Sequence, residues 1–483
     1  MTKQKQFSTS RSRRDLDKRN IGTMLQHEET LPRLPVPSLQ DTAAKYLKSV
    51  HPLVSEKEYK HTEKVVQDFI KPGGIGEKLQ EQLVAKANET HTVNWLSEWW
   101  NDAAYLSYRD PVVFFVSYFY SHRDDRKRRT PASRAAALST ATLQFRREIQ
   151  ERTLAPSLAK KTPQTMASYD WLFNACRIPG QKTDHGEKYE PHDNAHIIVI
   201  RKNKFFLLPH EYNGQQLSTA ELETQFEKII ELAGNQKDAP IGALSGDNRD
   251  LWNESRNELI AADPKNETLL HQIQAASFVV CLDDTSPVTL EERATELWHG
   301  DGENRFYDKP AQLVVFENGA SGFLGEHSMM DGTPTHRLNS TICDLIARGK
   351  IDLGSSANQP HAKPLVAPPK QLQFTVTDAI SRRIQDSLQN FHHRRDMFDL
   401  RVQYFQGYGA DLMKRFKCSP DAYIQMLLQL AYYKMYGICR PTYESAATFK
   451  FRDGRTETCR TVSDESVAFC KAMENPAIEV SRQ

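Results

Sequence analysis

The sequence has no apolar run long enough to cross a membrane. Its longest such run, Pro111–Tyr120 (PVVFFVSYFY), has about half of the length that a bilayer-spanning helix needs. The apolar and β-branched composition of this run predicts a buried strand. We therefore expect no transmembrane segment.

The chain also has almost no net charge. Lys and Arg total 63 and Asp and Glu total 62, which leaves a formal charge of +1 over 483 residues. No global field therefore draws the protein towards nucleic acid or an anionic membrane, and any anion site must be local. The charged stretch Ser121–Arg134 lacks interleaved aromatic residues, so we expect a solvated loop there and no nucleic-acid partner.

Cysteine is scarce, with seven residues that are never spaced as CxxC. This spacing argues against a zinc ribbon and a disulfide framework, and it favours reduced thiols inside a cell. We expect a cytoplasmic protein, with the mitochondrion as second choice because the first twenty residues are basic and rich in hydroxyls. No metal site is expected, because the adjacent His392 and His393 point apart on a helix and no acidic or thiol ligands complete the set.

The length allows two or three domains, and the patterns along the chain suggest where they divide. Residues 1–30 are predicted to be a basic, disordered tail. Residues 31–110 begin with the proline-rich arm LPRLPVPSL, which cannot be helical, and continue as helices packing on the core.

Beyond residue 110, helical and strand patterns alternate and predict a first α/β domain over residues 111–375. The strands include AHIIVIRKNKFFLLP and SFVVCLDD, and the helices include ATLQFRREIQ and TLEERATELW. The polar, proline-rich residues 355–371 are the predicted linker. Residues 376–483 then form a second, incomplete domain.

One histidine follows a predicted hairpin. Two apolar runs, AQLVVF and SGFLGEH, flank an Asn-Gly turn, so His327 should lie where the second strand ends. Its imidazole can accept and return a proton near neutral pH, and Gly325 and Gly332 would leave room for a substrate. The alternative is a histidine hydrogen-bonded in the core, with Asp331 capping the turn.

A second stretch suggests an anion site. Ser419 as N-cap, Pro420 at the first position and Gly437 at the end predict a helix over residues 420–436. Its apolar face consists of Ile424, Leu427, Leu428 and Ala431. Three cationic residues lie just upstream, so they and the helix N–H donors could bind a phosphorylated ligand: Lys414, Arg415 and Lys417. A solvated basic turn is the alternative.

Several longer motifs, in order, resemble the choline/carnitine acyltransferase family, with the fungal carnitine O-acetyltransferases as the most similar branch. They include NWLSEWWNDAAYLSYRDPVVFF, MASYDWLFNACRIPG, NRFYDKPAQLVVFENGASGFLGEHSMMDG, SPDAYIQMLLQLAYY and PTYESAATFKFRDGRTETCR. HSMMDG also fits the HxxxDG pattern of chloramphenicol acetyltransferase-like enzymes. The resemblance covers nearly all of residues 31–475. It implies an α/β fold of two chloramphenicol acetyltransferase-like domains with the active-site tunnel between them, the second domain being incomplete.

The resemblance also implies a reaction: reversible transfer of a short acyl group, acetyl, between CoA and L-carnitine. His327 would be the general base, with Asp331 structural beside it. CoA would be a co-substrate, with no permanently bound cofactor and no covalent enzyme intermediate. The residues matching the CoA-binding loop are Lys414, Arg415, Lys417, Ser419 and Asp421. Ala410 stands where the family usually carries a lysine.

For carnitine, the resemblance points to three residues. Tyr443 and Ser445 of PTYESA and Thr456 of GRTET match positions that bind the carnitine carboxylate, and hydroxyls can donate to an anionic oxygen without adding charge. Choline acetyltransferases usually carry valine at the position of Thr456, so carnitine is favoured over choline. Ordinary packing in a half-buried strand is the alternative.

In the family, a further segment follows the equivalent of AFCKAM and supplies a Ser-Thr-Ser strand and an arginine for the carnitine site and the oxyanion. Neither occurs here, so we expect a fragment or truncated relative with impaired activity, because oxyanion donors contribute strongly to rate. The alternatives are a medium- or long-chain carnitine acyltransferase, or a truncated, inactive CoA-binding relative. Family members often act as monomers, which we expect here.

Overall fold

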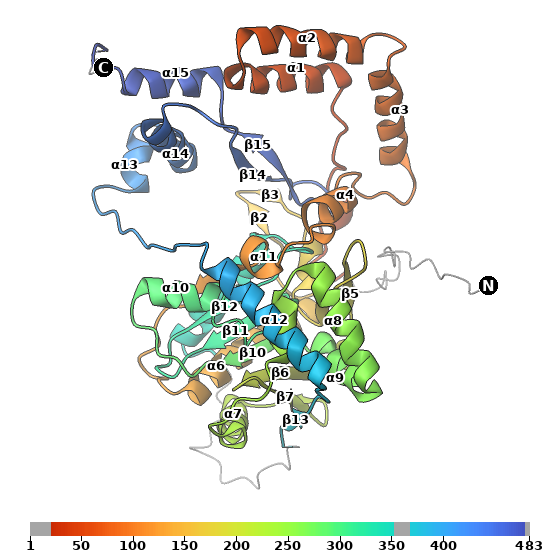
Figure 1. The fold of residues 1–483 in the computed structure, drawn as a ribbon, viewed down its shortest axis with the longest axis vertical. Coiled ribbons are helices and arrows are strands. Elements are labelled where there is room, and N and C mark those ends of the chain that lie inside the picture. Colours follow the sequence, from red (N-terminus) through yellow and green to blue (C-terminus); the bar gives the residue numbers. More distant parts are fainter. Residues whose placement is uncertain (1–20, 352–367, 479–483) are drawn as a thin grey trace, which may run out of the picture. The chain divides into compact units, whose positions relative to one another are not determined.

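The protein forms two compact units in its computed structural model, which describes residues 21–351 and 368–478 (Figure 1). The larger unit holds the residues before Leu31 together with Glu98–Val402. The smaller unit holds Leu31–Ser97 and the residues from Gln403 onwards. Each unit is described by itself below.

The larger unit is built on a seven-stranded sheet in the order β1-β12-β11-β10-β6-β7-β13. Strands β6, β10 and β11 are parallel to one another and the other neighbours are antiparallel. This confirms the predicted α/β class, and the structure adds that the strands form one large central sheet. The strands are β1 (Tyr118–Ser121), β6 (His196–Arg201), β7 (Lys204–Pro209), β10 (Val279–Leu282), β11 (Gln312–Val315), β12 (Ser321–Gly325) and β13 (Lys370–Leu372).

Helices cover both faces of this sheet, and the sequence of β6 shows why. Ile197 and Val199 point into one core and Ile198 and Ile200 into the other, because side chains alternate along a strand. Helices α6 (Pro131–Gln150), α7 (Thr219–Ala233) and α11 (Gly332–Ala347) pack in the first core. Helices α8 (Arg249–Ala262), α9 (Pro264–Ala275), α10 (Leu290–Trp298) and α12 (Asp378–Arg395) pack in the second (Figure 1).

Short elements complete the larger unit. The connecting helices and turns are η2 (Glu28–Thr30), α4 (Ser97–Asn101), the π-helical η4 (Asp102–Leu106), α5 (Val112–Phe115), η5 (Ala167–Trp171) and η6 (Ile241–Gly246). Three two-stranded ladders are formed by β2 (Leu158–Ala159) with β3 (Thr162–Pro163), β4 (Ala175–Ile178) with β5 (His185–Lys188), and β8 (Glu211–Tyr212) with β9 (Gln215–Gln216).

The predicted strands β6, β7 and β10, the β11–β12 hairpin and the helical segments in α6 and α10 are confirmed. The prediction for Pro111–Tyr120 is wrong in its first half. Val112–Phe115 form the short helix α5, and the strand begins only at Tyr118. Val112 and Val113 are buried as expected, but a short apolar run does not distinguish a buried helix from a buried strand.

The predicted disordered tail is also wrong for its last residues. Met24 is buried in the core of the larger unit, and its N–H donates to the Arg152 carbonyl at 2.9 Å. The Glu28 carboxylate accepts from the Met166 N–H at 3.0 Å. Residues 1–20 and most of the expected linker at residues 355–371 lie outside the described residues.

The larger unit continues past residue 375, where the sequence suggested a boundary. Helix α12 buries Ile380, Ile384 and Phe391 in the second core, and the unit extends through Val402. The division at residue 375 therefore remains a prediction about domains, distinct from the compact units seen here. No helix among the described residues is both long and apolar enough to span a membrane.

The smaller unit contains mainly helices and one two-stranded ladder. Its helices are α1 (Leu39–Val50), η3 (His51–Leu53), α2 (Glu56–Ile70), α3 (Ile75–Asn88), α13 (Ala410–Arg415), α14 (Pro420–Tyr436) and α15 (Asp464–Met473), and its strands are β14 (Tyr443–Ala447) and β15 (Thr456–Arg460). Residues 32–38, in the predicted extended arm, form neither helix nor strand. The carbonyl of Pro32 accepts from the Arg452 N–H, and that of Pro37 accepts from the Gln80 amide, so the arm lies along this unit.

Candidate active site

His327 lies in the loop between the end of β12 and the start of α11 in the larger unit, as the hairpin pattern predicts. Its neighbours Glu326 and Ser328 are buried, whereas 26% of the His327 side chain is exposed. A buried sheet therefore fixes the backbone while part of the imidazole stays accessible. A general base needs this combination, because the ring must be held still and also reach its substrate.

Two tyrosine rings hold the imidazole. The ring of Tyr105, from η4, is stacked on it with centroids 5.1 Å apart, and the ring of Tyr118, from β1, meets it edge-on at 4.9 Å. The Tyr118 hydroxyl lies 2.8 Å from the Thr335 hydroxyl. Burial raises the pKa of Tyr118, so this phenol stays neutral and serves as packing.

Asp331 occupies the N-cap position of α11 and is buried beside the histidine. Its Oδ1 lies 3.9 Å from Nδ1 of His327, a distance at which a carboxylate stabilises a protonated imidazole. The alternative role predicted for Asp331, as a cap, is supported only by its position, because its side chain makes no cap hydrogen bond to α11.

The two glycines near His327 differ in the space beside them. A Cβ on Gly325 would lie 2.8 Å from the Phe323 ring and 3.0 Å from the Tyr118 ring. Gly325 therefore lets Tyr118 approach the histidine, and the expectation that it leaves room for substrate is wrong. A Cβ on Gly332 would have ordinary contact, 3.5 Å from the Tyr120 hydroxyl.

The predicted CoA residues lie in the smaller unit, on the connection between α13 and α14. Lys414 and Arg415 end α13, and Lys417 has a left-handed φ of 59°, which turns the chain sharply. Ser419 caps α14, with its Oγ accepting from the Ala422 N–H, and Asp421 lies in the first turn. The helix predicted over 420–436 is confirmed, and the five candidate side chains are exposed together on one short segment.

The apolar face predicted for α14 is not a core face among the described residues. Ile424 and Leu428 are 45% and 55% exposed, and the buried residues of the helix are Gln429 and Leu430. The helix itself was predictable because its caps are local. Which side it buries depends on what packs against it, and no described segment covers the predicted face.

The predicted carnitine residues share one face of the β14–β15 ladder. Ala447 pairs with Thr456 and Ser445 with Thr458, so the side chains of Tyr443, Ser445 and Thr456 project from the same side. The Thr456 Oγ1 is buried and makes no hydrogen bond to any other described residue, which leaves it free to donate to a ligand.

One contact ties the ladder to the proposed CoA segment. Partial desolvation and the neighbouring carboxylate of Asp421 raise the pKa of Glu444 on β14. Asp421 and Glu444 therefore lie next to each other, and the first turn of α14 is adjacent to β14. Because side chains alternate along a strand, Glu444 points to the face of the ladder opposite to the one that carries Tyr443, Ser445 and Thr456. The CoA segment is therefore adjacent to the ladder but not to its predicted carnitine face.

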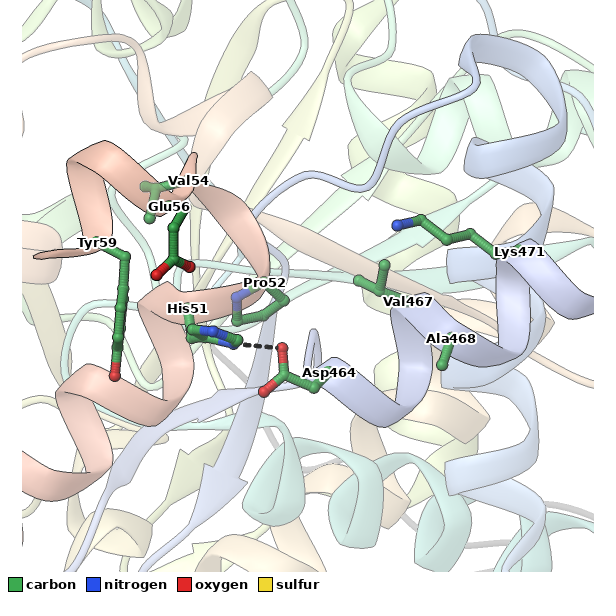
Figure 2. Close-up of a pocket in the computed structure, with 9 residues that line it drawn as sticks. All are labelled: His51, Pro52, Val54, Glu56, Tyr59, Asp464, Val467, Ala468 and Lys471. Carbon is green, nitrogen blue, oxygen red and sulfur yellow. Dashed lines mark hydrogen bonds and ion pairs between the residues drawn. The ribbon is translucent and has the colours of Figure 1, made fainter.

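Two other kinds of site are alternatives for this role, a metal centre and a pocket in the smaller unit. Among the described residues no group of three or more His, Cys, Asp or Glu side chains is placed to hold a metal ion. A pocket of about 370 Å³ in the smaller unit lies between η3 and α2 on one side and α15 on the other (Figure 2). It contains the His51–Asp464 contact of 2.7 Å but none of the residues predicted for CoA or carnitine.

Comparison with known proteins shows the family to which this chain belongs. Residues 34–483 match the Choline/Carnitine O-acyltransferase family. The chain belongs to this family. Membership makes it an acyltransferase, as the motifs predicted.

Individual relatives from this acyltransferase family match along nearly the whole chain. The mitochondrial carnitine O-acetyltransferase of Saccharomyces cerevisiae is 36% identical over 476 residues, which cover 96% of this chain and 70% of the relative. The human carnitine O-acetyltransferase is 35% identical, covering 94% and 73%. The bovine peroxisomal carnitine O-octanoyltransferase is 32% identical, covering 94% and 75%.

Sequence reasoning found His327 but missed the groups that hold it. Tyr105 and Tyr118 lie in matched motifs, yet no local pattern places either ring on the imidazole. Glu326 and Arg177, which contact each other below the histidine loop, were also missed. The one available signal was a glutamate next to the histidine in the otherwise apolar run FLGEH.

Proposed function

We propose that this acyltransferase catalyses the reversible transfer of an acetyl group between CoA and L-carnitine, with His327 as the general base. The observation that carries the proposal is the position of His327, partly exposed at the end of β12 and held by Tyr105 and Tyr118. The names of the yeast and human relatives support the acetyl group and carnitine as substrates.

In the proposed mechanism, neutral His327 removes the proton of the carnitine hydroxyl as that oxygen attacks the thioester carbonyl of acetyl-CoA. The C–S bond then breaks, and the imidazolium returns its proton to the CoA sulfur. The reverse reaction starts with removal of the thiol proton. Asp331 favours the imidazolium in both directions, because its carboxylate is 3.9 Å from Nδ1.

The smaller unit supplies the proposed substrate contacts. Lys414, Arg415 and Lys417 offer cations for the CoA phosphates, close to the capped start of α14 at Ser419. Asp421 belongs to the same segment and contacts Glu444.

For carnitine, the proposal uses the shared face of the β14–β15 ladder. Tyr443, Ser445 and Thr456 present three hydroxyls on that face, which suit an anionic carboxylate. The two-domain, chloramphenicol acetyltransferase-like architecture and the monomeric state remain predictions. The name of the yeast relative supports the mitochondrion, which our sequence analysis placed second to the cytoplasm.

A second candidate is a carnitine acyltransferase for longer chains. It is favoured by one observation, the 32% identity to the bovine carnitine O-octanoyltransferase. The two candidates share the base and the carnitine face and differ in acyl length. Rates with acetyl-CoA, octanoyl-CoA and palmitoyl-CoA at equal concentration separate them.

The deciding experiment is a thiol-release assay with acetyl-CoA and L-carnitine on the wild-type chain, His327→Ala and the control His393→Ala, whose side chain is exposed on α12. We expect His327→Ala to lose at least about a hundredfold in kcat, the usual contribution of a general base, and the control to match wild type. Full activity of His327→Ala would refute the base.

Choline replaces carnitine in a parallel assay, where we expect little turnover. CoA binding is followed separately by calorimetry on the same preparations. A wild-type chain that binds CoA but transfers no acyl group to carnitine or choline refutes the proposed activity and supports the inactive CoA-binding alternative.

A further inference from the structure

A buried ionic cluster lies directly beneath the histidine loop. Arg177 on β4 is 1% exposed, and its guanidinium has four different partners. Nε donates to Asp184 at 2.7 Å, Nη1 to Glu326 at 3.2 Å, and Nη2 to the carbonyls of Tyr105 at 2.8 Å and Tyr108 at 3.5 Å. Two of these four partners, Glu326 and Tyr105, are connected directly to His327.

Glu326 is the first connection. This carboxylate is 2% exposed and immediately precedes His327 in the chain. It accepts from the Ser328 N–H at 3.1 Å and from the Ser328 hydroxyl at 2.7 Å. The Glu326 side chain therefore bridges the backbone on either side of His327 and fixes the turn that carries the imidazole.

Tyr105 is the second connection. Its ring is stacked on the imidazole, and its carbonyl is held by Arg177. One guanidinium thus fixes the turn under the histidine and the backbone of the ring that covers its face. A bidentate or tridentate guanidinium suits this task, because its donors have a rigid planar geometry.

The rest of the cluster holds Arg177 in place. Asp184 also accepts from Arg249 at 2.6 Å, and Arg249 donates to Asp308 at 2.7 Å. Burial on its own would raise the pKa of Asp184, but Arg249 and Arg177 outweigh it and lower that pKa. Asp184 is therefore ionised between two guanidinium groups, and each acidic side chain in the cluster has a cationic partner.

We propose that Arg177 and Glu326 are positioning residues for His327, holding the turn and the stacked Tyr105 so that the imidazole is oriented for proton transfer. This inference rests on the proposed role of His327 as the base. Neither residue needs to touch a substrate. Their effect reaches the reaction through the orientation of the ring, and a general base loses rate when it is displaced by as little as an ångström.

The test uses Glu326→Gln and Arg177→Lys in the full chain. Glutamine keeps the size of the Glu326 side chain but removes its charge and weakens the contact to Arg177, because a neutral amide oxygen replaces the carboxylate. We expect kcat to fall by about tenfold or more while KM for carnitine and for acetyl-CoA stays within about twofold, because ring orientation is used in the transition state and not in substrate binding.

The pH profile gives a readout that a merely structural role would not change. Loss of the Glu326 charge removes a carboxylate from the residue next to the histidine, which disfavours the imidazolium. The acidic limb of kcat against pH should therefore move to lower pH in Glu326→Gln. Arg177→Lys keeps the charge, so it should retain the position of this limb and show a lower kcat.

The matched control is Asp283→Asn. Asp283 is a buried carboxylate paired with Arg305 at 2.7 Å, and its N–H bonds to Val315 at the far end of β11. His327 follows the end of β12 that pairs with Gln312, so the control breaks another buried ion pair at the opposite end of these strands. We expect it to lower the melting temperature and leave kcat and the pH profile unchanged.

A double variant tests whether Arg177 and Glu326 act together. If the two residues act as a unit, the double variant Arg177→Lys/Glu326→Gln should lose no more kcat than the more affected single variant. Circular dichroism and thermal melting identify any variant that fails to fold. If Arg177→Lys does not fold, the kcat and pH profile of Glu326→Gln alone decide the matter.

The outcomes separate this inference from the function on which it rests. Wild-type kcat and pH profile in Glu326→Gln, or losses that follow the melting temperature as in Asp283→Asn, would overturn positioning while an inactive His327→Ala still supports the base. An active His327→Ala would overturn both.

Discussion

The ring of Tyr105 lies nearly parallel to the imidazole of His327, with the planes inclined at 15° and the centroids 5.1 Å apart. Tyr118 meets the same imidazole at 69°. The two tyrosines come from a π-helical turn and from an edge strand, which are separated from the histidine by most of the larger unit's sequence. The orientation of the proposed base is therefore a property of the tertiary fold.

This stacking predicts a selective effect at Tyr105. Tyr105→Phe keeps the ring and should retain kcat within about twofold. Tyr105→Leu removes it, and since an aromatic pair contributes about 0.5–1.5 kcal/mol, kcat should fall by roughly 2- to 12-fold. Steady-state kinetics with acetyl-CoA and carnitine check this. An equal loss in both variants would show that the hydroxyl matters and not the stacking.

Thr456 should matter for carnitine and not for CoA. Its buried hydroxyl is available on the face shared with Tyr443 and Ser445. A hydrogen bond to a charged group contributes about 1.5–3 kcal/mol, so Thr456→Val should raise KM for carnitine by roughly tenfold or more. KM for acetyl-CoA should not change. Thr442→Val makes the same chemical change just before β14 and should leave both constants unaltered.

What the sequence predicts well here is local. Ser419, Pro420 and Gly437 fix both ends of α14, and the Asn-Gly turn fixes the β11–β12 hairpin and so the position of His327. What it misses is set by contacts between distant segments. Arg177 is bonded to Tyr105 and Glu326, and no periodicity reveals such pairings. The exposure of the predicted apolar face of α14 was missed for the same reason, because a helix face is buried only where another segment packs against it.

Substitutions in the proposed CoA segment should be able to lower or raise KM for acetyl-CoA. Ala410 and Lys414 are one turn apart on α13, so Ala410→Lys would place a second ammonium beside the first. KM for acetyl-CoA should fall in Ala410→Lys and rise in Lys414→Met, with each change weaker at high salt. Acetyl-pantetheine, which lacks the nucleotide phosphates, is the control substrate and should give the same KM with all three proteins.

The apolar side of α14 predicts weak, concentration-dependent self-association of a chain that we otherwise expect to be a monomer. Leu428 and Met435 are 55% and 72% exposed, and contiguous exposed apolar surface of this kind favours association. Leu428→Lys with Met435→Lys should lower light scattering and shift the protein towards the monomer in gel filtration. Val288→Lys, at a residue 79% exposed in the larger unit, is the control and should have little effect. Equal behaviour of both proteins would contradict the role of this face.

The protonation of His122 should make the stability of the larger unit depend on pH. It is buried, with Nε2 2.8 Å from the Asn339 Oδ1 and Nδ1 3.1 Å from the Ser321 hydroxyl. Because Oδ1 can only accept, Nε2 carries the proton, and the Ser321 hydroxyl donates to Nδ1. Burial lowers the pKa of His122 to about 4, although the Asn339 hydrogen bond opposes it.

The folded pKa of His122 lies below the ordinary value of 6.5, so the folded state binds fewer protons than the unfolded state between pH 6.5 and 4. Its contribution to stability is complete above pH 6.5 and is lost as the pH falls, by about 2 kcal/mol between pH 7 and 5. Urea unfolding at both pH values should show a smaller pH-dependent loss in His122→Gln than in wild type. His393→Gln, on the surface of α12, should behave as wild type. An unchanged loss in His122→Gln would mean that His122 is not the group that titrates.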